Sequence, residues 1–219
     1  MTPEDLAALH PRLFHLTAPE ALPGIERHGL LSARNIVERT GADPTLLSRR
    51  RAREVPIERA GDRYVLNDNI PLSEATLARV LDDAMTPADW LRHLNGRVFF
   101  WVDEDRLARL RGAATNRDRD RVVLVLDALS LARAHGDRMS LSPINSGATG
   151  RSPARRGRNT FTPLAAHSYD AWRRLRRPGK ALDRIAEVTV EDAVPDAMKH
   201  VLEVRHWEAG ARRMALNGA

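Results

Sequence analysis

Two side chains have a type and a setting suited to catalysis, and most of the chain separates them. Glu187 interrupts the apolar run at residues 185–190, and a carboxylate is costly to bury unless a partner or a solvent-filled cleft receives it. His15 follows Leu13 and Phe14 in a short apolar segment, and histidine is the side chain that titrates near neutral pH. If the fold brings both to one cleft, they predict proton transfer or stabilisation of a developing charge.

Each of these side chains also has a purely structural interpretation. A histidine on a buried strand more often completes a core than performs catalysis. On an alternating strand, Glu187, Thr189 and Glu191 would share a solvent face while the residues between them point inward. The sequence leaves both interpretations open, and they differ in the expected burial of Glu187.

Several other kinds of chemistry are excluded or poorly supported. The chain has no cysteine, which removes disulfides, thiolate metal sites and a cysteine nucleophile. No two histidines have the spacing of a helical zinc pair, and residues 118–121 alternate in charge as a solvated loop does. No glycine-rich phosphate loop of the P-loop or Rossmann type is present. We therefore expect no metal, and a nucleotide would have to bind in another way.

The charge of the chain favours an anionic partner. It has 35 basic residues, nearly all arginine, against 29 acidic ones, a net charge of +6 and an isoelectric point near 10.7. Arginine is always charged, and its planar fork suits phosphate groups. An arginine-rich proteome would give the same composition, so the positions of the arginines have to decide between the two explanations.

The overall composition is that of a folded globular protein. With 219 residues, 42% of them hydrophobic and 29% charged, the chain is expected to form one domain over residues 1–219. It has no apolar run of about 18 residues, the length needed to cross a membrane, and the segment 1–5 lacks the features of a signal peptide. A cytoplasmic protein without a membrane partner is the resulting expectation.

Short helices and strands alternate along the predicted fold. Capping signals and apolar periodicity predict helices that begin after Thr2 and after Thr86 and one that follows Asp103. A capping box of Thr17 with Glu20 predicts a helix over 19–28 that ends at Gly29. Further helices are predicted over 32–40, 44–51 and 73–84, and strands over 13–17, 64–66, 97–102, 122–126, 138–142, 186–190 and 201–204.

The most unusual segment lies between the predicted strands, at about 145–180. It begins with Asn145 and the small residues that follow it, and then carries several arginines. Loops of this length are uncommon in compact domains unless they bind something or are disordered, and the aromatic residues Phe161, Tyr169 and Trp172 argue against disorder. We therefore predict an ordered, basic, ligand-binding loop.

Five short motifs, taken in order, resemble the DarT family of DNA ADP-ribosyltransferases over nearly the whole chain. They are Phe14-His15-Leu16-Thr17 with the helix and Gly29-Leu30 turn behind it, Leu47-Ser48-Arg49-Arg50 before Val55-Pro56, Asp68-Asn69-Ile70-Pro71, Asn145-Ser146-Gly147-Ala148-Thr149, and residues 184–190 around Glu187. The stretch between Asn69 and Phe100 is longer and richer in helix than the family pattern, and the aromatic run after Val-Pro is absent. These departures put the choice of substrate in doubt more than the fold.

The resemblance implies an α+β fold, namely an ADP-ribosyltransferase-like split, mostly antiparallel sheet with flanking helices. It implies transfer of ADP-ribose from NAD, the cosubstrate, to nucleic acid, with single-stranded DNA the first choice, in a toxin or defence role that would pair with a macrodomain antitoxin. Glu187 and Arg50 would be catalytic. NAD would contact His15, Thr17, Gly29, Leu30, Asn35, Arg49 and Arg50, and the nucleic acid would contact Asn145, Thr149, Arg151, Arg155, Arg156 and Arg158.

Two other functions remain open at the level of sequence. One is a nucleic-acid-binding module that keeps the fold without catalysis, since a basic surface is enough to bind a phosphate backbone. The other is an ADP-ribosyltransferase that acts on RNA, protein or a small molecule. The catalytic interpretation predicts that His15 and Glu187 line one cleft, with their two strands as neighbours.

Overall fold

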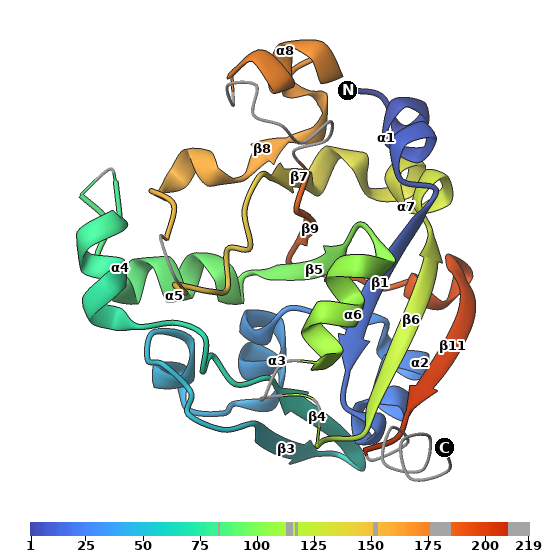
Figure 1. The fold of residues 1–219 in the computed structure, drawn as a ribbon. Helices are drawn as coiled ribbons and strands as arrows, with labels where there is room; N and C mark the ends of the chain where they lie inside the picture. Colours follow the sequence, from blue (N-terminus) through green and yellow to red (C-terminus); the bar gives the residue numbers. More distant parts are fainter. Residues whose placement is uncertain (83, 113–115, 117, 151–152, 176–184, 210–219) are drawn as a thin grey trace, which may run out of the picture.

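A seven-stranded antiparallel sheet forms the centre of the computed structural model, which describes residues 1–219 except 83, 113–115, 117, 151–152, 176–184 and 210–219 (Figure 1). The strand order is β11-β6-β1-β5-β9-β7-β8, and every pairing is antiparallel. The strands are β1 (Arg12–Thr17), β5 (Arg97–Trp101), β6 (Arg121–Asp127), β7 (Met139–Ser142), β8 (Thr162–Pro163), β9 (Glu187–Glu191) and β11 (Val201–Trp207). Two separate ribbons pair β2 (Leu30–Leu31) with β10 (Ala193–Val194) and β3 (Val55–Arg59) with β4 (Asp62–Leu66).

Short helices surround the sheet. The α-helices are α1 (Pro3–Leu9), α2 (Leu22–His28), α3 (Ala33–Thr40), α4 (Glu74–Val80), α5 (Pro87–Asn95), α6 (Glu104–Gly112), α7 (Ala128–His135) and α8 (Tyr169–Leu175). Capping boxes begin α1 at Thr2 and α5 at Thr86, as the sequence predicts. No helix in the described part of the chain is long and apolar enough to cross a membrane.

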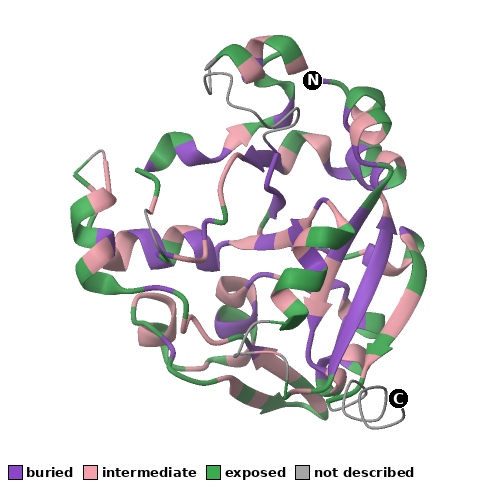
Figure 2. Cartoon of the chain, in the orientation of Figure 1, coloured by how far each residue is buried: buried purple, intermediate pink, exposed green. Residues whose placement is uncertain are grey.

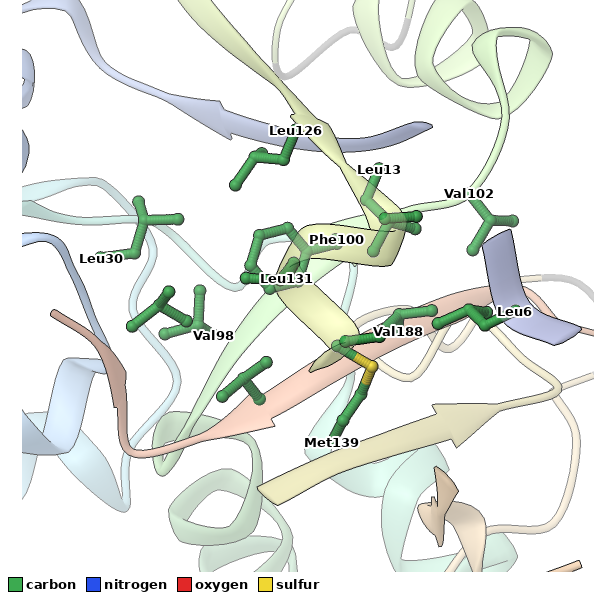
Figure 3. Close-up of a cluster of buried hydrophobic side chains, with 14 of the residues drawn as sticks. Leu6, Leu13, Leu30, Val98, Phe100, Val102, Leu126, Leu131, Met139 and Val188 are labelled. Carbon is green, nitrogen blue, oxygen red and sulfur yellow. The ribbon is translucent and has the colours of Figure 1, made fainter. Parts of the chain in front are cut away.

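The core lies on both faces of the sheet. Strand β6, second from the edge of the sheet rather than at its centre, is buried along almost all of its length (Figure 2). Val122, Leu124 and Leu126 face a large apolar cluster that includes residues of α1, α2 and α7. The alternate residues Val123 and Val125 face the other side and pack with residues that include Leu107 of α6 and Phe14 of β1. Figure 3 shows side chains of the larger cluster, among them Leu6, Leu13, Phe100, Leu126, Leu131 and Val188. The continuous apolar run of β6 is thus explained by helices on both sides.

The sheet is split between β1 and β5. Strand β1 pairs with β6 at six consecutive positions, from Arg12 to Thr17, but its registered pairing with β5 is the single pair Phe14–Trp101. Beyond that pair the backbones of the two strands no longer match residue for residue, and the His15 side chain makes the contact instead, through Nδ1 at 2.9 Å from the Phe99 carbonyl oxygen. The observed fold is therefore the α+β, mostly antiparallel split sheet that was expected.

The β2–β10 ribbon lies against the end of α2, where the chain turns sharply at Gly29. Gly29 has φ +75°, and a Cβ atom at this position would lie 2.2 Å from the Val194 carbonyl oxygen. Both the backbone conformation and the close approach of β10 exclude a side chain here. The sequence therefore places the helix end correctly, and the ribbon adds a reason for glycine that the sequence does not reveal.

Some local predictions are wrong. Thr17 does not cap a helix: the 3₁₀ helix Pro19–Ala21 that precedes α2 has Ala18 at its N-cap and no side-chain hydrogen bond. The helix predicted over 44–51 is only the 3₁₀ turn η2 (Pro44–Leu47), and α4 ends at Val80 rather than at 84. Strand β3 was missed because its alternation of apolar and charged residues is short and includes a proline.

Two predictions of longer range also need correction. Strands β1 and β9 are not neighbours, because β5 lies between them and pairs with both. The segment 145–180 is not one continuous loop, because it contains β8 at the sheet edge and helix α8. Its aromatic residues Phe161 and Trp172 are buried. These aromatic residues therefore indicate that the segment packs against the core, and not that it forms a ligand-binding loop.

Candidate active site

A cavity of about 670 Å³ opens in the split of the sheet, a volume in the range of small-molecule sites. His15 from β1, Phe99 and Trp101 from β5, and Glu187 from β9 all line it. Both residues that the sequence singles out for chemistry therefore face the same space, although β5 separates their strands. The split supplies the room that a continuous ladder of backbone hydrogen bonds would have closed.

The His15 ring is held in one orientation by the backbone of the neighbouring strand. A carbonyl oxygen only accepts, so Nδ1 carries a proton and donates it to the Phe99 carbonyl oxygen at 2.9 Å. Burial lowers the pKa of His15, and the Phe99 carbonyl only partly offsets this effect. The ring is therefore neutral near pH 7, and its Nε2 is a hydrogen-bond acceptor.

Glu187 is buried at the start of β9 and keeps a partly compensated charge. Only 4% of the residue is exposed, and Thr189 is completely buried, so the interpretation that places Glu187 on a solvent face is wrong. The Ser146 hydroxyl donates to Oε2 at 2.6 Å, and the Ser146 N–H donates to the same oxygen at 3.1 Å. Burial nevertheless raises the pKa of Glu187 to about 7, against the opposing effects of Ser146, Arg156 and Arg106. A carboxyl group of this kind changes its charge within the physiological pH range.

Arg156 holds the segment that contacts Glu187. It is only 3% exposed, and its Nη1 donates to the carbonyl oxygens of Ser146 at 3.1 Å and Ala148 at 2.9 Å. Its positive charge also lowers the pKa of Glu187. The predicted contact of Arg156 with nucleic acid therefore needs correction: the side chain is buried and bonded to the protein backbone, where it positions the Ser146 segment.

Arg51, rather than Arg49 or Arg50, is the member of the arginine run that lines the cavity. Its guanidinium donates to the carbonyl oxygens of Asn67 and Leu46 and, at 3.0 Å, to the Asn95 side chain. Burial lowers the pKa of Arg51 to about 10, and the charge of Asp68 offsets only part of this effect. Within the described part of the chain, no carboxylate lies within ion-pair distance of Arg51, so this buried cation lacks a close counter-charge.

Arg97 presents a second partly buried cation to the same cavity. Its guanidinium stacks over the Phe161 ring at 4.6 Å, and its Nε is buried without a hydrogen-bond partner. Burial lowers the pKa of Arg97, and Glu191 opposes that effect. Five arginines and three carboxylates line the cavity. Without the members of the ion pairs Arg121–Glu54, Arg119–Asp68 and Arg106–Asp103, three arginines and the single carboxylate Glu187 remain. The walls therefore favour an anionic ligand.

The remaining predicted cofactor residues divide into two groups. Thr17, Gly29 and Leu30 line the cavity. Asn35 is not among the lining residues, and its side chain donates to Asp192 at 3.3 Å. Arg49 and Arg50 are also outside the cavity, so the catalytic role expected of Arg50 has no geometric support.

The predicted nucleic-acid residues also lie in different settings. Asn145 lines the cavity, whereas the Thr149 hydroxyl accepts from the Ser73 N–H at 2.7 Å and fixes the segment to the start of α4. Arg155 is exposed and forms an ion pair with Asp82. Arg158 is exposed, and Arg151 lies outside the described residues.

Sequence reasoning missed Ser146 and Arg97 as members of the site, and it left open which of Arg49, Arg50 and Arg51 would contact NAD. Ser146 lies inside a motif that was quoted, but its bond to Glu187 spans 41 residues and has no local signal. Arg51 is adjacent to the two arginines that were selected, and it is held inward by acceptors on Leu46, Asn67 and Asn95. Arg97 begins the apolar strand β5, where a cation is unusual, and this position was the one available clue.

A second group of titratable side chains brings His135, Asp196 and His200 together, with potential ligand atoms within 4.8 Å of one another. Arg138 donates to His135 Nδ1 at 2.8 Å, and a guanidinium never accepts. The ring proton of His135 is therefore on Nε2, which donates to Asp196 at 2.7 Å. A metal at Nε2 would need the lone pair of that nitrogen, so the geometry suits a hydrogen-bonded network better than a metal centre.

Comparison with known proteins identifies the family. The fold is an α+β split antiparallel sheet with a cavity in the split, and the sequence profile of DUF7002, described as a family of unknown function, matches residues 11–201. The chain belongs to the DUF7002 family. A search of curated proteins found no match.

Two solved structures share a loose overall similarity with the chain. One is DarT from Thermus sp. 2.9 in complex with NAD+, with 15% identity, a TM-score of 0.39, and coverage of 95% of this chain and 87% of that one. The other is the same protein in complex with ADP-ribosylated single-stranded DNA, with 16% identity, a TM-score of 0.40 and the same coverage. The roles of individual residues therefore rest on the geometry of this chain.

Proposed function

We propose that this protein is an NAD-dependent ADP-ribosyltransferase that modifies nucleic acid, with a base of single-stranded DNA as the first choice of acceptor. The observation that carries the proposal is the convergence of neutral His15 and titratable Glu187 on one cavity with cationic walls. The motifs that contain these two residues are also those in which the sequence resembles the DarT family.

The cavity has the charges that a dinucleotide needs. The pyrophosphate of NAD carries two negative charges, and Arg51 is a buried cation without a close carboxylate, while Arg97 has a buried Nε without a partner. Guanidinium groups bind phosphate oxygens through strong charge-assisted hydrogen bonds. The aromatic residues Tyr64, Phe99 and Trp101 add flat apolar surface to the walls, which suits planar rings.

The residues that line the cavity divide the reaction between them. His15 and Thr17 would orient the nicotinamide ribose, and the Glu187 carboxylate would stabilise positive charge that develops on the ribosyl carbon. In the reaction the bond between this carbon and nicotinamide breaks, and nicotinamide keeps the electron pair. A nitrogen or oxygen of the acceptor bonds to the carbon and loses a proton, for which Glu187 is the available base.

A transferase of this kind would leave a mark on DNA that a cell has to control. In a toxin or defence role, a macrodomain hydrolase that removes the modification would be the matching antitoxin. Such a partner binds the product and needs no surface on this chain.

The direct test is to incubate the protein with NAD labelled in its adenosine part together with DNA, RNA and protein. The expected result is release of nicotinamide and label in the single-stranded DNA fraction. Label in RNA or protein would change the proposed acceptor but would still support an NAD-dependent ADP-ribosyltransferase. Intact NAD combined with tight oligonucleotide binding would overturn the transferase proposal in favour of a binding module.

A further inference from the structure

Three exposed arginines beside the cavity, Arg49, Arg50 and Arg53, lack carboxylate partners. They lie between η2 and β3, and no described carboxylate is within ion-pair distance of any of them. Many other exposed arginines are paired, for example Arg133 with Glu4 and Arg155 with Asp82. The segment 49–53 therefore concentrates three exposed cations within five residues. The pKa of the nearby Asp43 carboxyl is lowered by hydrogen bonds from Thr45 and, to a smaller extent, by the charge of Arg49.

Two shallow hollows flank this segment, and each shares a lining residue with the cavity. The first, of about 510 Å³, is lined by residues that include Arg49, Arg50 and Arg53, and the second, of about 530 Å³, is lined by residues that include Arg50 and Pro71. The hollows share Arg50. Arg51 borders both the first hollow and the cavity, and Pro71 borders both the second hollow and the cavity. The arginines thus follow the rim of the proposed active site.

The segment is held in place from behind, so its arginines are presented on a fixed backbone. The Arg51 N–H donates to the Asn69 side chain at 3.2 Å, and the Asn69 N–H donates to the Arg51 carbonyl oxygen at 2.8 Å. Arg50 Nη2 donates to the Ile70 carbonyl oxygen at 2.8 Å. Since this order already exists without a ligand, less conformational entropy is lost when a ligand binds.

The acidic groups near residues 49–53 show in which direction along the surface an anionic chain can run. The carboxylate of Asp43 is engaged by the Thr45 N–H at 2.8 Å and by the Thr45 hydroxyl at 2.6 Å. Glu74 borders the second hollow on the side of α4. An anionic chain is therefore favoured over residues 49–53 and disfavoured beyond Pro71, where it would meet Glu74.

We propose that Arg49, Arg50 and Arg53 form a track for the sugar–phosphate backbone of a single-stranded nucleic acid, which delivers a base to the cavity across Arg51 and Pro71. The choice of acceptor class rests on the proposed function. The track replaces two earlier expectations, that Arg49 and Arg50 bind NAD and that residues 151–158 carry the nucleic acid. In the latter segment Arg156 is buried and Arg155 is paired.

The test measures binding without NAD. The full chain with Arg49→Gln, Arg50→Gln and Arg53→Gln is compared with a matched variant that carries Arg12→Gln, Arg39→Gln and Arg59→Gln, three exposed arginines that line none of the three hollows. Both variants lose three charges, and thermal unfolding checks that each is folded. The anisotropy of a labelled 12-nucleotide DNA is followed over a series of KCl concentrations.

Three lost phosphate contacts reduce the slope of log K against log salt concentration by about 2 and weaken binding by about 10- to 100-fold near 0.1 M salt. The track requires this change in the first variant and a clearly smaller one in the matched variant. Equal losses in the two variants, no loss in either, or no binding by the unaltered protein would overturn it. If the variants bind DNA as predicted but the unaltered protein does not cleave NAD, the track is supported and only the transferase proposal is rejected.

Discussion

Two networks of titratable groups in the described part of the chain differ in their surroundings: Glu187 lines the cavity of about 670 Å³, whereas His135, Asp196 and His200 line none of the three hollows described above. Around Glu187, two donors from Ser146 and the charges of Arg156 and Arg106 leave the carboxyl with a pKa of about 7. Around Asp196, burial raises the pKa, but the hydrogen bond from His135, a backbone hydrogen bond and the electrostatic interactions with His135 and His200 together outweigh burial, and the net shift of the pKa is downward. The first network holds a carboxyl whose charge is incompletely stabilised, and the second holds one whose charge is satisfied.

The difference teaches how a functional site can be distinguished from a structural one. The His135–Asp196–His200 group has the residue types of an active site, yet its hydrogen bonds are made within the group and to Ser130 and Arg138. Glu187 instead borders a space large enough for a ligand, with cations on the walls. An incompletely compensated charge beside a cavity is a better indicator of chemistry than the residue types alone.

The largest expected effect is on catalysis. Glu187→Gln keeps the size of the side chain and removes its charge, so NAD cleavage should fall by about 10²- to 10⁴-fold while NAD affinity changes little. Steady-state release of nicotinamide measures the first quantity, and calorimetry measures the second. Asp196→Asn in the closed network and exposed Glu38→Gln should both stay within about threefold of the unaltered protein. Equal losses in Glu187→Gln and Asp196→Asn would erase the distinction between the networks.

The second effect is on stability, and the two networks should show opposite dependence on pH. The folded pKa of Glu187 is raised to about 7 from 4.5, so its contribution is fully present below about pH 4.5 and is lost as pH rises through 7. Glu187→Gln should therefore gain up to about 3 kcal/mol in free energy of unfolding at pH 8 relative to the unaltered protein, and less at pH 5. Urea titrations at the two pH values measure the difference.

For Asp196 the sign is reversed. Its pKa is lowered from 3.8, so its contribution is present above that value and is lost as pH falls further. Asp196→Asn should destabilise the protein slightly at pH 8, by less than about 1 kcal/mol because the carboxylate is partly exposed. A stabilised Asp196→Asn protein at pH 8 would contradict the assignment of this network as satisfied.

The third effect is on NAD affinity, and it compares an arginine of the cavity with an arginine of the His135–Asp196–His200 network. Arg51 lines the cavity, whereas Arg138 donates to the Glu191 and Ala193 carbonyl oxygens and to His135. Arg51→Gln should weaken NAD binding by at least about 10-fold, the usual cost of a lost charged hydrogen bond, and Arg51→Lys should recover part of the loss. Arg138→Gln should leave NAD affinity within about twofold. Calorimetric titration with NAD distinguishes these outcomes, and equal affinity of the two glutamine variants would argue against phosphate binding at Arg51.

The smallest effect concerns the titration of Glu187. Activity should rise with pH to a plateau above about pH 7, since the carboxylate form is required. Ser146→Ala removes the 2.6 Å hydrogen bond to that form, so the midpoint of the profile should move to higher pH while the plateau changes only a few fold. Ser130→Ala, which removes the matching hydroxyl beside His200, should leave the midpoint in place. An unmoved midpoint in Ser146→Ala would remove Ser146 as the group that positions Glu187.

The sequence predicts the elements of this fold better than their assembly. Capping signals and the continuous apolar run identify α1, α5 and the buried strand β6 because those signals are local. The split between β1 and β5 depends on a single paired position and on the His15 side chain, and no local pattern encodes it. The error over the order of β1, β5 and β9 has the same origin.

The site shows the same division between local and distant information. Glu187 was recognisable because a carboxylate in an apolar strand is costly. Its partner Ser146 and the arginine that supports it come from distant segments, and Arg51 is held inward by acceptors that include the distant Asn67 and Asn95. Contacts between segments far apart in sequence decide which of several similar residues joins a site.

The central claim is tested most directly by a crystal structure of the Glu187→Gln protein with NAD bound, since the slow turnover expected of this variant would preserve the ligand. The account predicts NAD in the split between β1 and β5, with the bond between ribose and nicotinamide beside residue 187 and the pyrophosphate against Arg51. NAD bound outside this cavity, or inside it with that bond directed away from residue 187, would contradict the account.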